Sequence, residues 1–289
     1  MYSPRTDLAF EANERFMKSQ APDGKIDGII TEQEDFDSLW INRIKITNEN
    51  GSNSLGRPIG NYITINVPDI RYDNSAFELA CQKISEEIKK LITFSDDSKA
   101  LVIGLGNREI TPDALGHEVV SGILITNHIK EQQPEVLNEN FRAVCAISPG
   151  VLGTTGIESA EIIRAVAEKT NPDVVIVADA LAAADFGRIS TTFQICDTGI
   201  QPGAGVGNNR SEISEASLGI KVIAIGVPTM IDAGNLMDEN SSDENAASLM
   251  VTPRDIDAII KKTGMAIAGG INLALHKNLT LSEINEYVG

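Results

Sequence analysis

Aromatic residues are scarce in this sequence, and so are cysteines and long hydrophobic runs. Aromatics make up 4 % of the 289 residues, so the core has to be built from Ile, Val, Leu and Ala. Such a core favours buried strands covered by helices over a β-sandwich. With 42 % hydrophobic and 22 % charged residues, the composition is that of an ordinary globular protein.

The three cysteines are odd in number and show no C-x-x-C pairing; they are Cys81, Cys145 and Cys196. This pattern argues against a disulfide framework and against a thiolate metal site. The three histidines are not spaced as metal ligands are. Walker A, G-x-S-x-G and H-E-x-x-H sequences are also absent.

The net charge of −17 repels phosphate backbones and anionic lipid, so nucleic-acid and membrane-surface binding are not expected. It suits a basic or neutral protein partner, but acidity is also common in cytosolic proteins. No run reaches the ~18 apolar residues of a membrane span, and the first residues lack the apolar stretch of a signal peptide. We therefore expect a cytoplasmic protein.

Strand and helix patterns alternate along the chain. Runs rich in β-branched residues predict buried strands at 62–67, 100–105, 143–147, 174–178, 191–195 and 222–227. Helix signals lie between them: a capping-box spacing from Ser75 to Glu78, Thr-Pro pairs at 111–112 and 252–253, and an apolar period over 158–169. The alternation predicts a three-layer α/β fold, with a mostly parallel twisted sheet and helices on both faces.

In an open α/β sheet, ligands bind outside the carboxyl ends of the strands, so the polar residues that follow each predicted strand are candidates for a site. These are Asn107, Asp113, Asp179, Asp197 and Asp232. Carboxylates gathered at one edge of a sheet suit general acid/base work on a bound water.

Each carboxylate also has a structural interpretation. Spacing alone favours a helix-capping role for Asp113 and a turn or cap role for Asp232. For Asp179, which ends an apolar run, function and structure are evenly balanced. Asp197-Thr198-Gly199 matches the signature of pepsin-type proteases, but those are β-rich, and we interpret the triplet as a turn.

A glycine-rich loop over 202–210 follows the Asp197 turn. It contains Gly203, Gly205, Gly207 and Asn208, and Asn208 occupies the last position of a G-x-G-x-x-G pattern, so the dinucleotide motif is not satisfied. An anion cradle at this loop stays a weak alternative.

Taken together, these segments resemble the germination protease family of spore-forming bacteria. No single motif is specific, but their order and spacing cover nearly the whole chain. The matching stretches are RTDLA (5–9), GNYIT (60–64), GLGN (104–107), TPDALG (111–116), PGVLG (149–153), TGIE (155–158), DALAA (179–183), QICDTGI (194–200), the loop 202–208, IAIGVPTMID (223–232) and GINLALH (270–276).

The resemblance implies an atypical aspartic endopeptidase that degrades small acid-soluble spore proteins during germination. Its catalytic dyad matches Asp113 and Asp179, which replaces the capping interpretation of Asp113. Two such carboxylates share a proton, so one can activate water while the other polarises the scissile carbonyl, and no metal or cofactor is required. Asn107, Asp197 and the Gly203–Asn208 backbone are expected to position substrate or stabilise the oxyanion.

The family is made as a zymogen that cleaves itself, and the matching bond here is Asp7–Leu8. Residues 1–7 would then be a short pro-segment and 8–289 a single peptidase domain. The resemblance also implies a homotetramer, in the cytoplasm of the spore core. His117 and Asp185 depart from the family pattern, and a carboxylate at Asp185 near Asp179 is expected to raise the pKa of the dyad.

Two rival functions stay open at this point. The Gly-x-Gly-Asn segment followed by Asp also looks like hydrogenase maturation proteases, which the family resembles in fold, and nickel-dependent processing would mark that activity. A non-catalytic binding protein on the same fold is the second rival, with the Gly203 loop gripping an acidic or phosphate ligand.

Overall fold

The computed structural model describes residues 5–20, 26–95, 97–203, 210–236 and 249–288. Within these residues one nine-stranded sheet runs in the order β1-β2-β3-β7-β8-β6-β4-β5, and β9 pairs with β8. The strands are β1 (Ile29–Asp35), β2 (Trp40–Ile46), β3 (Gly60–Asn66), β4 (Lys99–Gly104), β5 (Ala143–Ile147), β6 (Val174–Ala183), β7 (Thr192–Cys196), β8 (Lys221–Asp232) and β9 (Met250–Val251).

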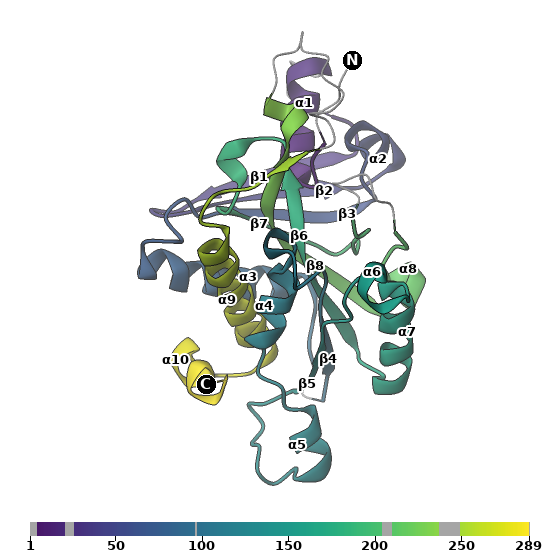
Figure 1. The fold of residues 1–289 in the computed structure, drawn as a ribbon, viewed down its shortest axis with the longest axis vertical. Coiled ribbons are helices and arrows are strands. Elements are labelled where there is room, and N and C mark those ends of the chain that lie inside the picture. Colours follow the sequence, from purple (N-terminus) through teal and green to yellow (C-terminus); the bar gives the residue numbers. More distant parts are fainter. Residues whose placement is uncertain (1–4, 21–25, 96, 204–209, 237–248, 289) are drawn as a thin grey trace.

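Helices join and cover these strands (Figure 1). They are α1 (Ala9–Gln20), α2 (Glu49–Leu55), α3 (Asn74–Leu91), α4 (Leu115–Ser121), α5 (Asn127–Gln132), α6 (Leu152–Thr155), α7 (Ser159–Thr170), α8 (Glu215–Leu218), α9 (Ile256–Leu275) and α10 (Leu281–Val288), with short 3-10 turns η1 (Thr111–Asp113), η2 (Phe186–Arg188) and η4 (Ala233–Leu236).

The predicted α/β class is confirmed, and the sheet has two halves. Strands β5, β4, β6 and β8 pair in parallel, as the alternating pattern predicted. Strands β1, β2, β3, β7 and β8 pair antiparallel, and so does β9 with β8. The sheet is therefore mixed. The expectation of a mostly parallel sheet fits only the first half, because the antiparallel strands follow connections whose pairing direction no local pattern reveals.

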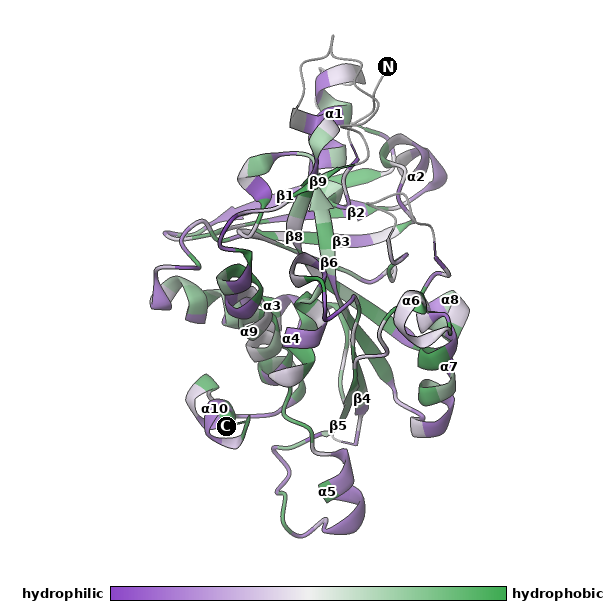
Figure 2. Ribbon diagram, in the orientation of Figure 1, coloured by the Kyte–Doolittle hydropathy of each residue, from purple (hydrophilic) through white to green (hydrophobic). Residues whose placement is uncertain are grey.

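Helices cover both faces of the sheet, as predicted, and the central strands are hydrophobic along most of their length (Figures 1 and 2). On one face, α3, α4 and α9 pack on alternate residues of the strands in the largest hydrophobic core. On the other face, α7 packs on β4 and β6, and α1 and α2 pack on β2 and β3. Between these two smaller clusters, part of the second face is left for a pocket.

Several predicted boundaries move because the end of a helix depends on caps that spacing alone does not fix. Helix α3 is capped by Asp73, which accepts the Ser75 N–H, and not by the Ser75–Glu78 box. Helix α9 begins at Ile256, after the Thr252-Pro253 pair. The Thr111-Pro112 pair opens a 3-10 turn, and α4 follows it.

Strands β6 and β8 are longer than their sequence patterns predicted. Asp179 does not end β6; the strand continues to Ala183, with a register shift against β8 between Leu181 and Ala182. Strand β8 likewise runs through Pro228 to Asp232. The prediction ended each strand before its first polar or proline residue. In the structure the pairing between β6 and β8 continues beyond Asp179 and Pro228, so both strands are longer.

Strands β1 and β2 and helix α1 were not predicted. The outer strand β1 is mostly exposed and carries Thr, Glu, Gln and Asp, so it lacks the apolar signature of a buried strand. Among the described residues, no helix is both long and apolar enough to cross a membrane.

The contact between β4 and α4 depends on two glycines. A Cβ on Gly104 would lie 2.0 Å from the Gly116 backbone oxygen, a separation that no packing tolerates. We predict that Gly104→Ala destabilises the fold by about 1–3 kcal/mol or more, the usual penalty of overpacking, measured by urea unfolding. Gly153→Ala is the control, because a Cβ there meets nothing within 4 Å; equal stability of the two variants would contradict the prediction.

Candidate active site

Asp179 is a carboxyl group in the middle of a strand. Its side chain is buried, with 6 % of the residue exposed, and one of its oxygens accepts the N–H of Ala180 at 2.9 Å. On the adjacent strand β8, its partner is Gly226. A Cβ on Gly226 would lie 2.5 Å from the Asp179 backbone oxygen and 2.7 Å from Cγ of Leu181, so only glycine fits beside Asp179 under the Leu181 side chain.

Asp113 reaches the site from η1, which follows the end of β4. The Asn107 N–H donates to Asp113 Oδ2 at 2.7 Å. Gly106 makes this approach possible: its φ is +102°, and a Cβ there would lie 1.9 Å from the Asp113 backbone oxygen. The turn is tied to β8 as well, because the Thr229 hydroxyl donates to the Pro112 carbonyl at 2.7 Å.

Charge and burial set the pKa values of the two carboxyls. Burial raises the pKa of Asp179 well above its usual value, and the nearby carboxylates of Asp113 and Asp7 raise it further. Burial also raises the pKa of Asp113, and the Asn107 N–H partly offsets that rise. Asp179 is therefore the harder of the two to ionise, and the two carboxyls titrate as a pair.

Residues 5–8 cross the site beside β6. The Asp7 N–H donates to the Ala182 carbonyl at 2.9 Å, and its Oδ2 accepts the Ala182 N–H at 2.8 Å. Burial raises the pKa of Asp7, while the Ala182 N–H and the Arg57 charge lower it. Three carboxyls thus meet here, from the amino-terminal segment, η1 and β6.

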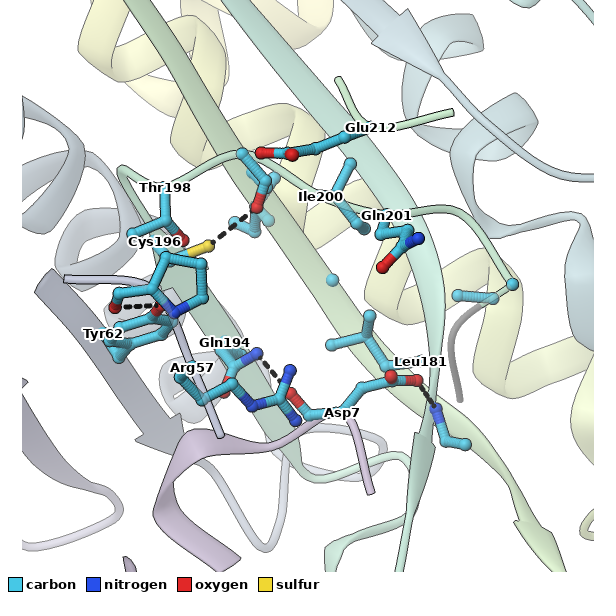
Figure 3. Close-up of a pocket in the computed structure, with 18 of the residues that line it drawn as sticks. Asp7, Arg57, Tyr62, Leu181, Gln194, Cys196, Thr198, Ile200, Gln201 and Glu212 are labelled. Atoms are coloured by element: carbon cyan, nitrogen blue, oxygen red, sulfur yellow. Dashed lines mark hydrogen bonds between the residues drawn. The ribbon is translucent and has the colours of Figure 1, made fainter. Parts of the chain in front are cut away.

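A pocket of about 340 Å³ lies over this part of the sheet. Asp7, Arg57 and Gln194 converge at one end of it, and Thr198, Gln201 and Glu212 lie toward the other (Figure 3). Tyr62 and Cys196 form part of the lining between; burial raises the pKa of the Cys196 thiol, which donates to the Gly199 carbonyl at 3.4 Å.

The other predicted site residues are placed differently. Asn107 supports Asp113 through its backbone N–H, while its side chain accepts the Glu109 N–H at 3.0 Å. Asp197 is turned to Asn61, accepting its backbone N–H at 2.8 Å and its side-chain N–H at 2.7 Å. Gly203 lines the pocket, whereas Gly205, Gly207 and Asn208 lie outside the described residues.

The two departures from the family pattern lie apart from the dyad's interactions. Asp185 caps η2, where its side chain accepts the Gly187 N–H at 2.8 Å. The carboxylates that raise the pKa of Asp179 are Asp113 and Asp7. The additional carboxylate next to the dyad is therefore Asp7 of the amino-terminal segment, whereas the sequence had suggested Asp185. His117 lies in α4.

Sequence reasoning missed several residues of the pocket as functional candidates. Gln194, Tyr62 and Arg57 all line it. Gln194 gave a usable signal, because it is a polar residue inside an otherwise buried strand, where an amide needs hydrogen-bond partners. Arg57 gave none, because it lies in a loop between α2 and β3 and its neighbours are set by the tertiary fold.

Known proteins match this chain in sequence along most of its length. The family model described as "Germination protease" matches residues 6–243. The chain belongs to the germination protease family. A germination protease of Clostridium perfringens is 40 % identical over 100 % of both chains, and that of Clostridium tetani is 40 % identical over 99 % of both.

The match extends beyond the clostridia: a germination protease of a Geobacillus species is 43 % identical over 93 % of this chain and 71 % of its own. Membership of the family makes this chain a peptidase with a role in spore germination. A hydrogenase maturation protease, HycI of Thermococcus kodakarensis, superposes with a TM-score of 0.33 and 18 % identity, over 61 % of this chain and 93 % of that one.

The raised pKa of Asp179 predicts a pH-dependent stability. A carboxyl with a higher pKa in the folded state stabilises the protein while it is protonated, which is fully the case below the unfolded pKa of about 4. The stabilisation is lost as the pH rises from the unfolded pKa through the folded pKa. Asp179→Asn cannot ionise, so we expect its free energy of unfolding, relative to wild type, to increase as pH rises from 4 to 8, by up to about 1.4 kcal/mol per pH unit for one proton.

Urea unfolding at several pH values measures this difference. Asp69→Asn, at an exposed carboxyl, is the control, and its difference from wild type should stay constant with pH. A constant difference for Asp179→Asn as well would show that burial does not disfavour the ionised form of Asp179.

Proposed function

We propose that this chain is an aspartic endopeptidase in which Asp113 and Asp179 activate a water molecule. The observation that carries the proposal is a pair of carboxyls just beyond the end of β4, Asp113 in the turn after that strand and Asp179 in β6 next to the Gly104–Ala178 pair. The pKa of each is raised, and the charge of Asp113 raises that of Asp179. Such pairs keep one proton between them at pH values where isolated carboxyls are fully ionised.

In this proposal Asp179 holds the proton. Asp113 and Asp179 each accept one backbone N–H, but Asp179 is more deeply buried, and its pKa is raised by burial and by the charges of Asp113 and Asp7. Ionised Asp113 takes a proton from water as the water oxygen bonds to the scissile carbon, and Asp179 donates its proton to the carbonyl oxygen. Collapse of this intermediate breaks the C–N bond, and the nitrogen leaves with the proton held by Asp113.

The amino-terminal segment supports self-cleavage at Asp7–Leu8, with residues 1–7 as a pro-segment and 8–289 as the peptidase domain. Asp7 pairs with Ala182 along β6 as an added strand would. Leu8 is fully buried. Its side chain occupies an apolar subsite made by Leu181, Ala183, Ile189 and Ile231. The described part of the segment thus lies in the site as a bound substrate does, which is the arrangement expected of a zymogen.

Family membership supports the substrate and the setting. We infer that small acid-soluble spore proteins are the substrate, cleaved in the spore core at germination by a homotetramer, without a metal or other cofactor. The net charge of −17 is compatible with this choice, because it favours encounter with basic or neutral protein partners over nucleic acid.

Loss of either carboxyl should abolish cleavage. We predict that Asp113→Asn and Asp179→Asn each lower the rate of cleavage of a small acid-soluble spore protein by at least about 10⁴-fold, since removal of one member of a catalytic unit costs nearly as much as removal of the whole. Mass spectrometry of the products gives both the rate and the bonds cut. Asp197→Asn is the matched control, because that carboxyl is bound to Asn61, and it should cut at the wild-type bonds.

The same experiment separates the rival functions. Cleavage by both variants at the wild-type rate would remove the dyad from the mechanism. Wild-type cleavage that requires added nickel would favour a processing protease of the hydrogenase-maturation type. If the wild type, Asp113→Asn and Asp179→Asn all bind a spore protein and none cuts it, the chain is a binding protein.

The apolar subsite predicts which residue follows the cut bond. Leu8→Ala removes the buried side chain and leaves a cavity, so docking of the segment weakens; we expect self-cleavage to slow by roughly tenfold or more. Leu8→Met conserves volume and should cleave near the wild-type rate. Intact-mass time courses measure both, with circular dichroism as the check of folding; wild-type speed in Leu8→Ala would exclude a role for this subsite.

A further inference from the structure

Gln194 holds the amino-terminal segment on both sides of one peptide bond. From β7, its Nε2 donates to the Asp7 carbonyl oxygen at 2.8 Å, and its Oε1 accepts the Ala9 N–H at 2.6 Å. The Asp7 carbonyl belongs to the Asp7–Leu8 bond. The Ala9 N–H is the second main-chain donor after that carbonyl, because the Leu8 N–H lies between them. One carboxamide therefore brackets Leu8. Figure 3 shows Gln194 beside Asp7, with its bond to the Asp7 carbonyl.

The orientation of the Gln194 amide follows from its partners. A backbone N–H is only a donor and a backbone carbonyl oxygen is only an acceptor. The group that meets the Ala9 N–H must be Oε1, so the group that meets the Asp7 carbonyl must be Nε2. Gln194 is also buried, with 8 % of the residue exposed, so water competes poorly for these bonds.

Strand register places Gln194 on the same face of the sheet as Asp179. Gly226 of β8 pairs with Gln194 of β7 on one side and with Asp179 of β6 on the other. Paired residues point to the same face of a sheet, and two strand spacings separate the outer backbones by about 10 Å. The main chain of Asp7 spans this interval, because its N–H donates to the Ala182 carbonyl of β6 and its carbonyl accepts from Gln194 of β7.

We propose that Gln194 is a catalytic residue: its Nε2 polarises the scissile carbonyl and stabilises the oxyanion that forms there, while its Oε1 aligns the chain beyond the cut. The inference rests on the proposed function and goes beyond it. Water adds to the Asp7 carbon, the carbonyl electron pair moves to the oxygen held by Nε2, and Asp179 completes the proton transfer described above.

This assignment differs from the sequence-based candidates for oxyanion stabilisation. Among these, Asn107 uses its backbone N–H for Asp113 and its side chain for Glu109, and Asp197 is bound to Asn61. A spore protein in the site meets the same Gln194 amide, because both contacts are to main-chain atoms, which every substrate carries.

Two substitutions test the proposal in the full chain. Gln194→Glu keeps an acceptor for the Ala9 N–H and replaces the donor on the carbonyl. Gln194→Met removes the donor without adding a charge. We expect each to slow self-cleavage and spore-protein cleavage by about 10²–10³-fold in kcat, the usual effect of losing one oxyanion donor. Gln33→Glu makes the same substitution on the exposed strand β1, outside the pocket lining; it is the control and should stay within about threefold of wild type.

Docking of the segment is measured separately from cleavage. In an Asp179→Asn background, hydrogen exchange of the Ala9 amide reports whether the segment still lies in the site. Slow cleavage by Gln194→Glu with a protected Ala9 amide supports the catalytic role. Slow cleavage with an unprotected amide overturns it, because Gln194 then only anchors the segment.

The remaining outcomes are also decisive. A Gln194→Met variant that cuts at the wild-type rate, with Gln194→Glu slow, overturns the inference, because the added charge and not the lost donor is then the cause. Wild-type rates in both Gln194 variants, with Asp113→Asn and Asp179→Asn inactive, overturn this inference and leave the proposed function standing. Wild-type cleavage by both Asp113→Asn and Asp179→Asn contradicts the proposed function itself.

Discussion

The burial of one carboxyl group within the sheet is the constraint on which the rest of the structure depends. Asp179 lies in β6 with hydrophobic residues before it and a glycine beside it, where an unpaired charge is strongly disfavoured. Among the described residues, the charged groups that shift its pKa are the carboxyls of Asp113 and Asp7. A position that only stabilised the fold would favour a cationic partner, whereas neighbouring carboxyls that share a proton are typical of acid–base sites.

The mixed sheet explains how the residues of the site come together. Its parallel half supplies Asp179 and, through the turn after β4, Asp113. Its antiparallel half supplies Tyr62 and Gln194 from β3 and β7. Strand β8 belongs to both halves, and the main chain of Asp7 crosses their junction from Ala182 of β6 to Gln194 of β7. The antiparallel pairing of β7 with β8 brings Gln194 to this junction.

The amino-terminal segment is part of the structure as well as a candidate substrate. Glu11 of α1 accepts the N–H groups of Ala184 and Asp185, and the Arg57 side chain donates to the Thr6 carbonyl at 2.6 Å. These bonds flank Asp7 and Leu8 and hold them against β6. These contacts both fill the pocket and fix the position of the Asp7–Leu8 bond in it.

The sequence by itself determined the α/β class and the buried central strands, because these depend on apolar runs, and it made Asp113 and Asp179 candidates through a series of motifs along the chain. Spacing alone favoured a cap at Asp113, and only the resemblance made it a catalytic candidate. The antiparallel half of the sheet, the presence of Asp7 beside Asp179 and the position of Gln194 were decided by the tertiary structure alone. The pairing of β3 with β7 and the contact of Asp7 with β6 join segments more than a hundred residues apart. The other antiparallel pairs join segments closer in the chain, but their direction and register are also fixed by packing, which no local pattern records.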